Sequence, residues 1–398
     1  MQASPTRSRF IPLYITAFVN IAAFSMVFPL LPSFAKELHA TDAQVGLIAS
    51  SFALAQLLFS PFWGMLSDKF GRKRIISIGI LGLAASFFLF GIAQSIPLLI
   101  VARFLQGMFS GASIPTVRAY TADITTKEER VKMMGRVQGF FALGIILGPA
   151  LAGFFGQQSF ALPFFGASVI ALVNALFVFF LLPESLPKEQ RKEFVLKNSF
   201  IQLIFLFREL KSYLAPLFLL SFLWSFAISN NQVNVPLLGL EKFSIGTKEI
   251  GFVFMLLGLV SAIFQFFIIS KIVEIFGKQK TVLWGMAIMG VGLLAMPFLP
   301  SHVAYLYGAT VLVAIGSGVS HPVISALLSE ETPEGQGTTM GTANAFESLG
   351  RFISPLLGGF LFGITPIAPF LFSALVIAFI LWFLVARTHF LKVNPSTQ

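Results

Sequence analysis

Twelve long apolar stretches constrain this chain more than any other feature of its sequence. A membrane-spanning helix needs about 20 mostly apolar residues, because each residue rises about 1.5 Å across a hydrocarbon core of about 30 Å. The stretches cover residues 11–35, 44–66, 75–94, 97–121, 133–156, 160–182, 213–238, 249–270, 281–299, 302–327, 338–363 and 366–387. They predict an all-α polytopic membrane protein with twelve transmembrane helices.

The composition excludes several classes of protein. Only 11% of the 398 residues are charged and 56% are hydrophobic, whereas a soluble domain carries roughly 25% charged residues. An ordinary soluble enzyme is therefore excluded. The chain contains no cysteine, which excludes disulfides, thiolate metal sites and thiol catalysis. We find no Walker loop, no complete dinucleotide-binding glycine motif and no cluster with metal-ligand spacing, so we predict no enzyme activity, no cofactor and no metal.

Lysine and arginine are divided unequally between the two sides of a twelve-span chain. With a cytoplasmic N-terminus, twenty of the 27 lie in cytoplasmic segments and four within the apolar stretches, whereas the opposite side receives only Lys36, Lys242 and Lys248. Cytoplasmic loops of membrane proteins carry an excess of lysine and arginine. We therefore predict a multi-pass protein of the cell inner membrane with both termini in the cytoplasm. The net charge of +10 is interpreted as an orientation signal, not as a nucleic-acid surface.

The chain contains an internal duplication. A shift of 206 residues aligns the two halves almost without gaps and pairs Phe70 with Phe276, Gly71 with Gly277, Gly135 with Gly341, Pro149 with Pro355, and Gly153 with Gly359. Parallel repeats of helices are a design of secondary transporters. We predict two six-helix bundles, residues 1–182 and 212–398. A cytoplasmic linker over 183–211 joins them, and its second part is a candidate interfacial helix.

A basic loop after the second stretch contains Gly64, Asp68, Gly71, Arg72 and Lys73. Glycine permits a tight turn, and an aspartate can accept bonds from an arginine or a helix end. The order of these residues resembles the GxLxDRxGRR signature of the major facilitator superfamily. The resemblance implies a cytoplasmic gate in which the aspartate and the arginine pair with an acid at the end of the fourth helix, the place of Asp123. The alternative is a basic loop that only sets the topology.

The echo of this loop in the second half runs from Glu274 to Lys280 and departs further from the signature. A second gate there is expected to be weaker than the first.

Arg103 lies in the fourth apolar stretch, where Arg103, Gln106 and Gly107 resemble the superfamily motif lxxxRxxqG. The family links this arginine to proton transfer. A buried arginine in a bilayer is costly and often functional, but the alternative is a structural arginine that bonds the carbonyls of neighbouring helices.

The fifth stretch contains Gly144, Gly148, Pro149 and Gly153, with Ala152 before the last glycine. This pattern resembles the gxxxGPxxGG motif of antiporters, in which Ala152 replaces one glycine. Small residues let helices approach closely, and a proline kinks its helix. A near copy around Pro355 indicates that both halves use this device, which weakens it as a mark of antiporters alone.

Glu347 is the one acid of the 17 that lies deep in an apolar stretch. It is about ten residues inside the eleventh stretch, roughly 15 Å from the cytoplasmic edge by helical rise. Arg351 follows four residues later on the same face. A buried carboxyl group beside an arginine can be poised to gain and lose a proton, and a cationic substrate can compete with that proton. The alternative is a static ion pair that joins helices.

Helices 1, 4, 7 and 10 line the cavity in this superfamily, and in this chain the apolar stretches of helices 1, 7 and 10 contain no acid. Many of the exporters that this chain resembles have acids in helices 1, 7 or 10, whereas this chain has amides at those places in helices 1 and 7. His321, in the tenth stretch, titrates near neutrality when unperturbed and is a second candidate proton carrier; the alternative is a capping or cavity-lining histidine. The predicted cavity-lining residues are Asn20, Gln138, Asn230, Asn231, Asn234 and Asn344.

Together these features resemble the twelve-helix bacterial drug:proton antiporters of the multidrug and tetracycline exporter type. The resemblance implies export of small amphipathic compounds by alternating access, driven by protons, with small-molecule substrate, protons and membrane lipid as partners and with a monomer as the working unit. Glu347, Arg351, Arg103 and His321 are the predicted coupling residues. One alternative is a carrier for a metabolite, sugar, siderophore or lipid, by uptake or uncoupled exchange. The other is a membrane receptor or scaffold that does not transport, against which the short loops argue.

Overall fold

The computed structural model describes residues 10–191, 212–331 and 336–386, and in these ranges the chain is helical with no β-strand. Most of the predicted linker, including its candidate interfacial helix, lies outside the described residues. The part that is described, residues 183–191, contains one short 3-10 turn at Lys188–Gln190.

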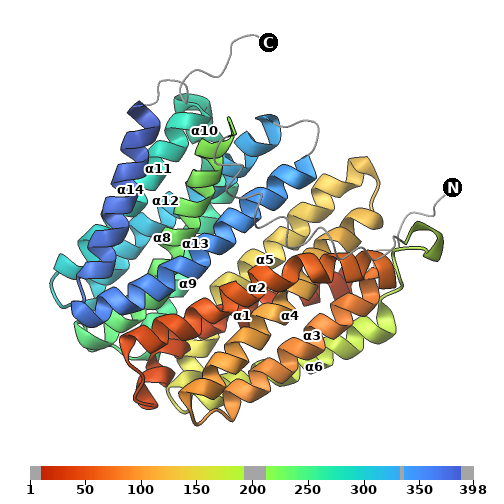
Figure 1. The fold of residues 1–398 in the computed structure, drawn as a ribbon, viewed down its shortest axis with the longest axis horizontal. Coiled ribbons are helices and arrows are strands. Elements are labelled where there is room, and N and C mark those ends of the chain that lie inside the picture. The colour runs from red at the N-terminus through yellow and green to blue at the C-terminus, as the bar shows by residue number, and fades with distance from the viewer. Residues whose placement is uncertain (1–9, 192–211, 332–335, 387–398) are drawn as a thin grey trace. The chain divides into compact units, whose positions relative to one another are not determined.

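Twelve apolar stretches correspond to twelve helical rods in the described chain (Figure 1). The first six rods are α1 (Phe10–Glu37), α2 (Asp42–Phe70), α3 (Arg72–Gly91), α4 (Ile96–Asp123), α5 (Lys127–Gly156) and α6 (Ala161–Leu181). The other six are α8 (Ala215–Glu241), α9 (Thr247–Ile263) continued by α10 (Ile269–Phe276), α11 (Lys278–Ala295), α12 (Val303–Glu331), α13 (Gln336–Ile364) and α14 (Ala368–Ala386). The predicted all-α twelve-helix fold is confirmed.

The eighth of these helical segments, α9 with its continuation α10, is not a uniform helix. A π-helical turn at Phe264–Ile268 separates α9 from α10, where the apolar pattern predicts one continuous helix. A π turn inserts a residue into the α-helical register, so the side chains beyond it point to a different face of the rod.

Local sequence signals explain where two of the helices begin. At the start of α2, the main-chain N–H of Thr41 donates to the side-chain oxygen of Gln44 at 2.8 Å, and the N–H of Gln44 donates to Oγ1 of Thr41 at 3.3 Å. This reciprocal pair is a capping box, which satisfies two helix N–H groups that have no partner within the helix. Thr126 caps α5 in a similar way by accepting the N–H of Glu129 at 3.3 Å.

Nine of the described helices are long and apolar enough to cross a membrane, and the shorter Ala368–Phe383 is also apolar. The two remaining long helices are α8, which carries the buried Asn230, Asn231 and Asn234, and α13, which carries the Glu347–Arg351 pair. Large apolar side chains cover much of the surface, and Phe180 and Phe267 are 73% and 76% exposed. Such a surface suits lipid rather than water, so the chain is a multi-pass membrane protein.

The described residues form two compact units. The first holds residues 10–40, 47–191 and 246–255, and the second holds 41–46, 212–245 and 256–386 with the gap at 332–335. Each unit therefore includes the first turns of one helix that continues in the other. The predicted domain limits at residues 182 and 212 stay a prediction, because the chain that joins them lies largely outside the described residues.

The helix pairs of the two units match each other. In the first unit α1 packs on α5, and α3 packs on α4 and α6; in the second unit α8 packs on α13, and α11 packs on α12 and α14 (Figure 1). These are the pairs that a repeat of six helices predicts. The core of the first unit includes Tyr120, Ile76 and Phe141, all almost fully buried, and it fixes the C-terminal end of α4 beside α3 and α6.

Candidate functional site

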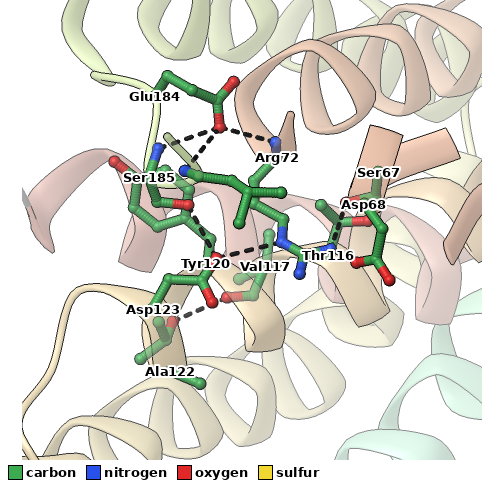
Figure 2. Close-up of polar contacts among 12 residues, drawn as sticks. Ser67, Asp68, Arg72, Thr116, Val117, Tyr120, Ala122, Asp123, Glu184 and Ser185 are labelled. Carbon is green, nitrogen blue, oxygen red and sulfur yellow. Dashed lines mark hydrogen bonds and ion pairs between the residues drawn. The ribbon is translucent and has the colours of Figure 1, made fainter. Parts of the chain in front are cut away.

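Arg72, the first residue of α3, joins the ends of α2 and α4 (Figure 2). Its Nη1 lies 2.5 Å from Oδ1 of Asp68 and 2.9 Å from Oγ of Ser67, and its Nε donates to Oδ2 of Asp123 at 3.1 Å. The Arg72 side chain is only 14% exposed, so these charge-assisted bonds are partly shielded from solvent. The structure thus brings together Asp68, Arg72 and Asp123, three of the predicted gate residues.

Gly71 makes the turn between α2 and α3. Its φ of 101° lies in the left-handed region that glycine adopts without strain. A side chain here would also collide with a residue that the sequence did not single out, since a Cβ would lie 2.6 Å from Cδ of Glu184. Glu184 and Ser185 belong to the segment after α6, and both bond to the Arg72 cluster.

Two other predicted gate residues stay outside this cluster. Lys73 places its Nζ 5.5 Å from the ring centroid of Phe179, a cation–π contact at the end of α6. Gly64 faces open space, because no atom lies within 4 Å of the position that a Cβ would take. Lysine and glycine at these places therefore do not contribute to the Arg72 ion pairs.

The second unit contains a simpler version of this arrangement. Gly277 again has a positive φ, of 76°, and Lys278, which aligns with Arg72, forms an ion pair with Glu330 at the end of α12. The Lys278 side chain is 37% exposed and that of Glu330 is 56% exposed. A pair this exposed contributes little to stability. That a second, weaker gate acts here stays a prediction.

Glu347 lies in α13 at the centre of a second charged cluster, in the second unit. Its Oε1 is 3.2 Å from Nε2 of His321 in α12, and its Oε2 is 3.4 Å from Nη1 of Arg351. Arg351 also donates from Nη2 to Oγ of Ser348 at 3.0 Å. The residue Glu347 is 9% exposed. The predicted pairing of Glu347 with Arg351 on one helix face is present, and His321 joins the same carboxylate.

Trp224 of α8 holds the imidazole of this cluster in place. The ring centroids of Trp224 and His321 are 4.2 Å apart with an interplanar angle of 32°, and Nε1 of Trp224 donates to the main-chain oxygen of Ser317 at 3.4 Å. Ser225, the next residue in α8, donates to the main-chain oxygen of Glu347 at 2.7 Å. Sequence reasoning missed Trp224, because no spacing rule relates it to α12.

The three groups of this cluster belong to three chemical classes. Glu347 supplies the two carboxylate oxygens, Arg351 donates to one of them from its guanidinium, and Nε2 of His321 lies within hydrogen-bond distance of the other. A role of this cluster in proton exchange stays a prediction.

The predicted cavity-lining residues fall into two groups. Asn230 and Asn234 are buried in the packing of α8 on α13: Nδ2 of Asn234 donates to Oδ1 of Asn230 at 2.8 Å, and both lie against Gly358. Asn231 and Asn20 are buried too, whereas Gln138 and Asn344 are exposed. Oδ1 of Asn20 accepts a bond from Ser113 of α4 at 3.4 Å. A role of these residues in lining a substrate cavity stays a prediction.

Arg103 is buried in the first unit. Its Nη1 donates to Oε1 of Gln106 at 2.5 Å, and its guanidinium lies 4.6 Å from the ring centroid of Phe52 and 5.8 Å from that of Phe24. Among the described residues no carboxylate lies within ion-pair distance of it. Aromatic faces and one amide therefore supply the contacts of this charge.

The glycines of the α5 motif bring the helix backbones close together. At Gly144 an added Cβ would lie 2.8 Å from the main-chain N of Ala22 and 2.9 Å from the oxygen of Phe18, both in α1. At Gly148, one turn later, an added Cβ would collide with Ser25 and Ala22, and at Gly153 it would lie 3.0 Å from Cα of Gly251 in the first turns of α9. Within the first unit, the motif is a packing surface for α1 and for the start of α9.

Replacing Gly144 with alanine is expected to destabilise the protein. The new methyl group meets backbone, which cannot rotate away, so α1 and α5 have to separate at a cost of about 1–3 kcal/mol. Thermal unfolding of the purified protein in detergent measures this. The matched control is Gly139→Ala in the same helix, where nothing lies within 4 Å of the added Cβ. Equal melting temperatures for the two variants would contradict the packing role.

No group of three or more histidine and acidic side chains that could hold a metal ion occurs in the part of the chain that the structure describes.

Comparison with known proteins identifies the family. The sequence profile of the Major Facilitator Superfamily matches residues 13–246 and 217–398 of this chain. The chain belongs to the major facilitator superfamily. The membership that the loop signature and the two helix motifs predict is therefore confirmed, and with it the assignment to a transporter family rather than to a family of enzymes.

Several relatives in this superfamily carry names that describe drug resistance. Multidrug resistance protein 2 of Bacillus subtilis (strain 168) is 31% identical over 374 residues, which cover 92% of each chain. The quinolone resistance protein NorA of Staphylococcus aureus is 28% identical over 387 residues, which cover 97% of this chain and 98% of that protein. Both matches span almost the whole length of the chain.

Solved structures of two transporters share the fold. The human organic anion transporter MFSD10 has a TM-score of 0.71 at 22% identity and covers 96% of this chain and 100% of its own. The nucleoside transporter NupG has a TM-score of 0.78 at 13% identity and covers 98% of this chain and 100% of its own. At this identity these likenesses establish the fold and no more.

Proposed function

We propose that this member of the superfamily exports small amphipathic, drug-like compounds across the cell inner membrane in exchange for protons, by alternating access. The observation that carries the proposal is the buried carboxylate of Glu347 in contact with the half-buried His321 and Arg351, because a membrane-buried acid with a titratable partner is suited to proton coupling. The names of the relatives supply the substrate class. The division of lysine and arginine supports a cytoplasmic position for both termini, and the transporter is expected to work as a monomer.

Proton and substrate compete for the cluster in the following way. A proton taken up by the His321–Glu347 pair neutralises the carboxylate or leaves it between two cations, so its attraction for a cationic substrate is low. Loss of the proton leaves one carboxylate beside Arg351 and a neutral imidazole. The cationic group of a substrate then binds more favourably than before. Differential affinity of this kind is what allows one ligand to drive the movement of another.

The Arg72 cluster serves as the cytoplasmic gate in this scheme. Its ion pairs hold the ends of α2 and α4 together and have to rearrange when the cytoplasmic side opens. The second, more exposed pair, Lys278 with Glu330, has the lesser part in the same transition.

Everted membrane vesicles test the proposed function. Vesicles energised to an acid interior receive a panel of dyes, quinolones and tetracycline, and proton release is followed by dequenching of a pH-sensitive dye. Vesicles that contain the protein are expected to dequench with at least one compound, whereas vesicles without it do not. No response to any compound would contradict drug export and favour the carrier for a metabolite, sugar, siderophore or lipid.

Replacing His321 with glutamine is expected to flatten the pH dependence of exchange. Glutamine keeps a polar group near Glu347 but cannot take up a proton, and histidine is the residue that titrates between about pH 5 and 8. The measurement is the rate of drug-driven proton movement across this range in wild type and variant. A variant with the same pH profile as wild type would show that His321 takes no part in proton exchange.

A further inference from the structure

The segment that follows α6 is docked on the gate region of the first unit (Figure 2). We call this segment, Pro183–Leu186, the strap. The main-chain oxygen of Pro183 accepts a bond from the Tyr120 hydroxyl at 2.8 Å. The Leu186 side chain is buried, with 8% of the residue exposed. The strap is the beginning of the chain that connects the two repeats, so the connector starts at the gate.

Glu184 ties the strap to the first turn of α3. Its Oε1 accepts the main-chain N–H of Arg72 at 2.7 Å and also those of Ser185 and Leu186 at 3.0 and 3.2 Å. The first N–H groups of a helix have no partner within the helix, and the helix dipole favours an anion there. One carboxylate oxygen thus closes the turn of the strap and also caps α3 at Arg72, the arginine of the gate.

Ser185 ties the strap to the other partner of the gate. Its Oγ donates to Oδ2 of Asp123 at 3.0 Å, and the same oxygen accepts the Nε of Arg72 at 3.1 Å. Asp123 is therefore held from two sides. The strap fixes Arg72 through its main chain and Asp123 through its carboxylate, while neither Glu184 nor Ser185 belongs to the Glu347 cluster of the second unit.

The turn at Gly71 is shaped for this carboxylate. An added Cβ would collide with the carboxylate of Glu184, whose Cδ would lie only 2.6 Å away. The glycine therefore does more than permit a positive φ, since it leaves the space in which Glu184 reaches the helix start.

We propose that Glu184 and Ser185 are positioning residues of the transporter, and that the docked strap keeps Arg72 and Asp123 aligned so that their ion pair can close the cytoplasmic gate. The movement of the gate is thereby linked to the connector between the repeats. The inference rests on the proposed function only for its transport readout, because docking of the strap can be measured without any substrate.

Thiol labelling measures the docking directly. The chain has no cysteine, so Leu186→Cys gives a single buried thiol, and its main-chain bond to Glu184 is kept. Adding Glu184→Ala is expected to raise the rate of maleimide labelling about tenfold or more, because the main-chain bonds that hold the strap are lost. Glu184→Gln keeps an acceptor oxygen and is expected to restore most of the protection. The matched control is Glu189→Ala, an exposed acid three residues beyond Leu186, which leaves the rate unchanged.

A second labelling arm tests the link between the strap and the ion pair. Asp123→Ala removes the acceptor of Ser185, so it too is expected to raise labelling of Leu186→Cys. Unchanged labelling in Glu184→Ala would overturn the docking, and unchanged labelling in Asp123→Ala would overturn its link to the gate. These outcomes do not depend on which compound, if any, the protein exports.

Transport kinetics test the positioning role. Glu184→Ala is expected to slow export about three- to tenfold with an unchanged KM for the drug, because the substrate cluster is untouched. The double variant Glu184→Ala/Asp123→Ala is expected to be no slower than Asp123→Ala alone, since both act on one pair. The positioning role would be overturned if the two substitutions slowed export independently, so that their effects multiplied in the double variant. It would also be overturned if Glu184→Ala exported normally although it allows fast labelling of Leu186→Cys. If wild type exports no tested compound, the proposed function fails while the labelling result stands.

Discussion

Replacing Glu347 with glutamine is expected to reduce drug-driven proton exchange by more than about tenfold, which corresponds to about 1.4 kcal/mol or more of lost coupling. Glutamine cannot carry a charge, so His321 and Arg351 lose the anion that lies 3.2 and 3.4 Å from them. A cationic substrate then meets one or two cations without a carboxylate. Dequenching in everted vesicles, normalised to the amount of protein in the membrane, measures the effect.

Two comparisons separate this effect from a general loss of structure. Glu37→Gln removes an exposed carboxylate at the end of α1 and is expected to leave exchange unchanged. Glu347→Asp keeps the charge and is expected to retain part of the exchange. Full exchange by Glu347→Gln would show that Glu347 belongs to a static ion pair, and it would transfer the coupling to His321 or Arg103.

The second large effect is expected at the Arg72 cluster, the proposed cytoplasmic gate. Asp68→Asn weakens the ion pair with Arg72, which is closed at 2.5 Å in a partly buried place. A hydrogen bond to a charged group contributes about 1.5–3 kcal/mol, so the balance between open and closed gate shifts by about ten- to a hundredfold. Export by Asp68→Asn is expected to fall accordingly, while drug binding to the purified protein stays near wild type.

Arg74→Gln is the matched control for this variant. Arg74 is exposed in the first turn of α3, so its replacement changes the local charge without touching the Arg72 ion pairs, and it is expected to leave export intact. Arg72→Gln is expected to reproduce the loss seen with Asp68→Asn. If wild type exports and Asp68→Asn exports at the same rate, the cluster is not a gate. Support for the interpretation as a scaffold requires a different result, namely that wild type itself does not export.

Much of the fold could be predicted, because a bilayer constrains the sequence in a simple way. Helices must satisfy their own main-chain bonds in hydrocarbon, so each apolar stretch of sufficient length gives one helix. The contact between Glu347 and Arg351 follows from helical spacing alone. The π turn at Phe264–Ile268 could not be predicted, since a run of phenylalanine and isoleucine is equally compatible with an unbroken helix.

The partners in the charged clusters were harder to predict. Glu184 is 112 residues from Arg72 in sequence, and it stands in a charged segment that is typical of a solvated linker. The contact of His321 with Trp224 depends on the register in which α12 packs on α8, which apolar sequence does not specify. Glu330 lies one position beyond the residue that the 206-residue shift aligns with Asp123. The repeat alone therefore predicts the residue before Glu330, and not Glu330 itself, as the partner of Lys278.

The most direct measurement of proton coupling needs no membrane. Purified protein in weakly buffered detergent solution is titrated with an exported drug, while a pH indicator reports protons released and tryptophan fluorescence reports binding. If drug and proton compete at the His321–Glu347 pair, wild type releases protons as it binds drug, and Glu347→Gln releases none. Drug binding by wild type without any proton release would contradict coupling through this cluster.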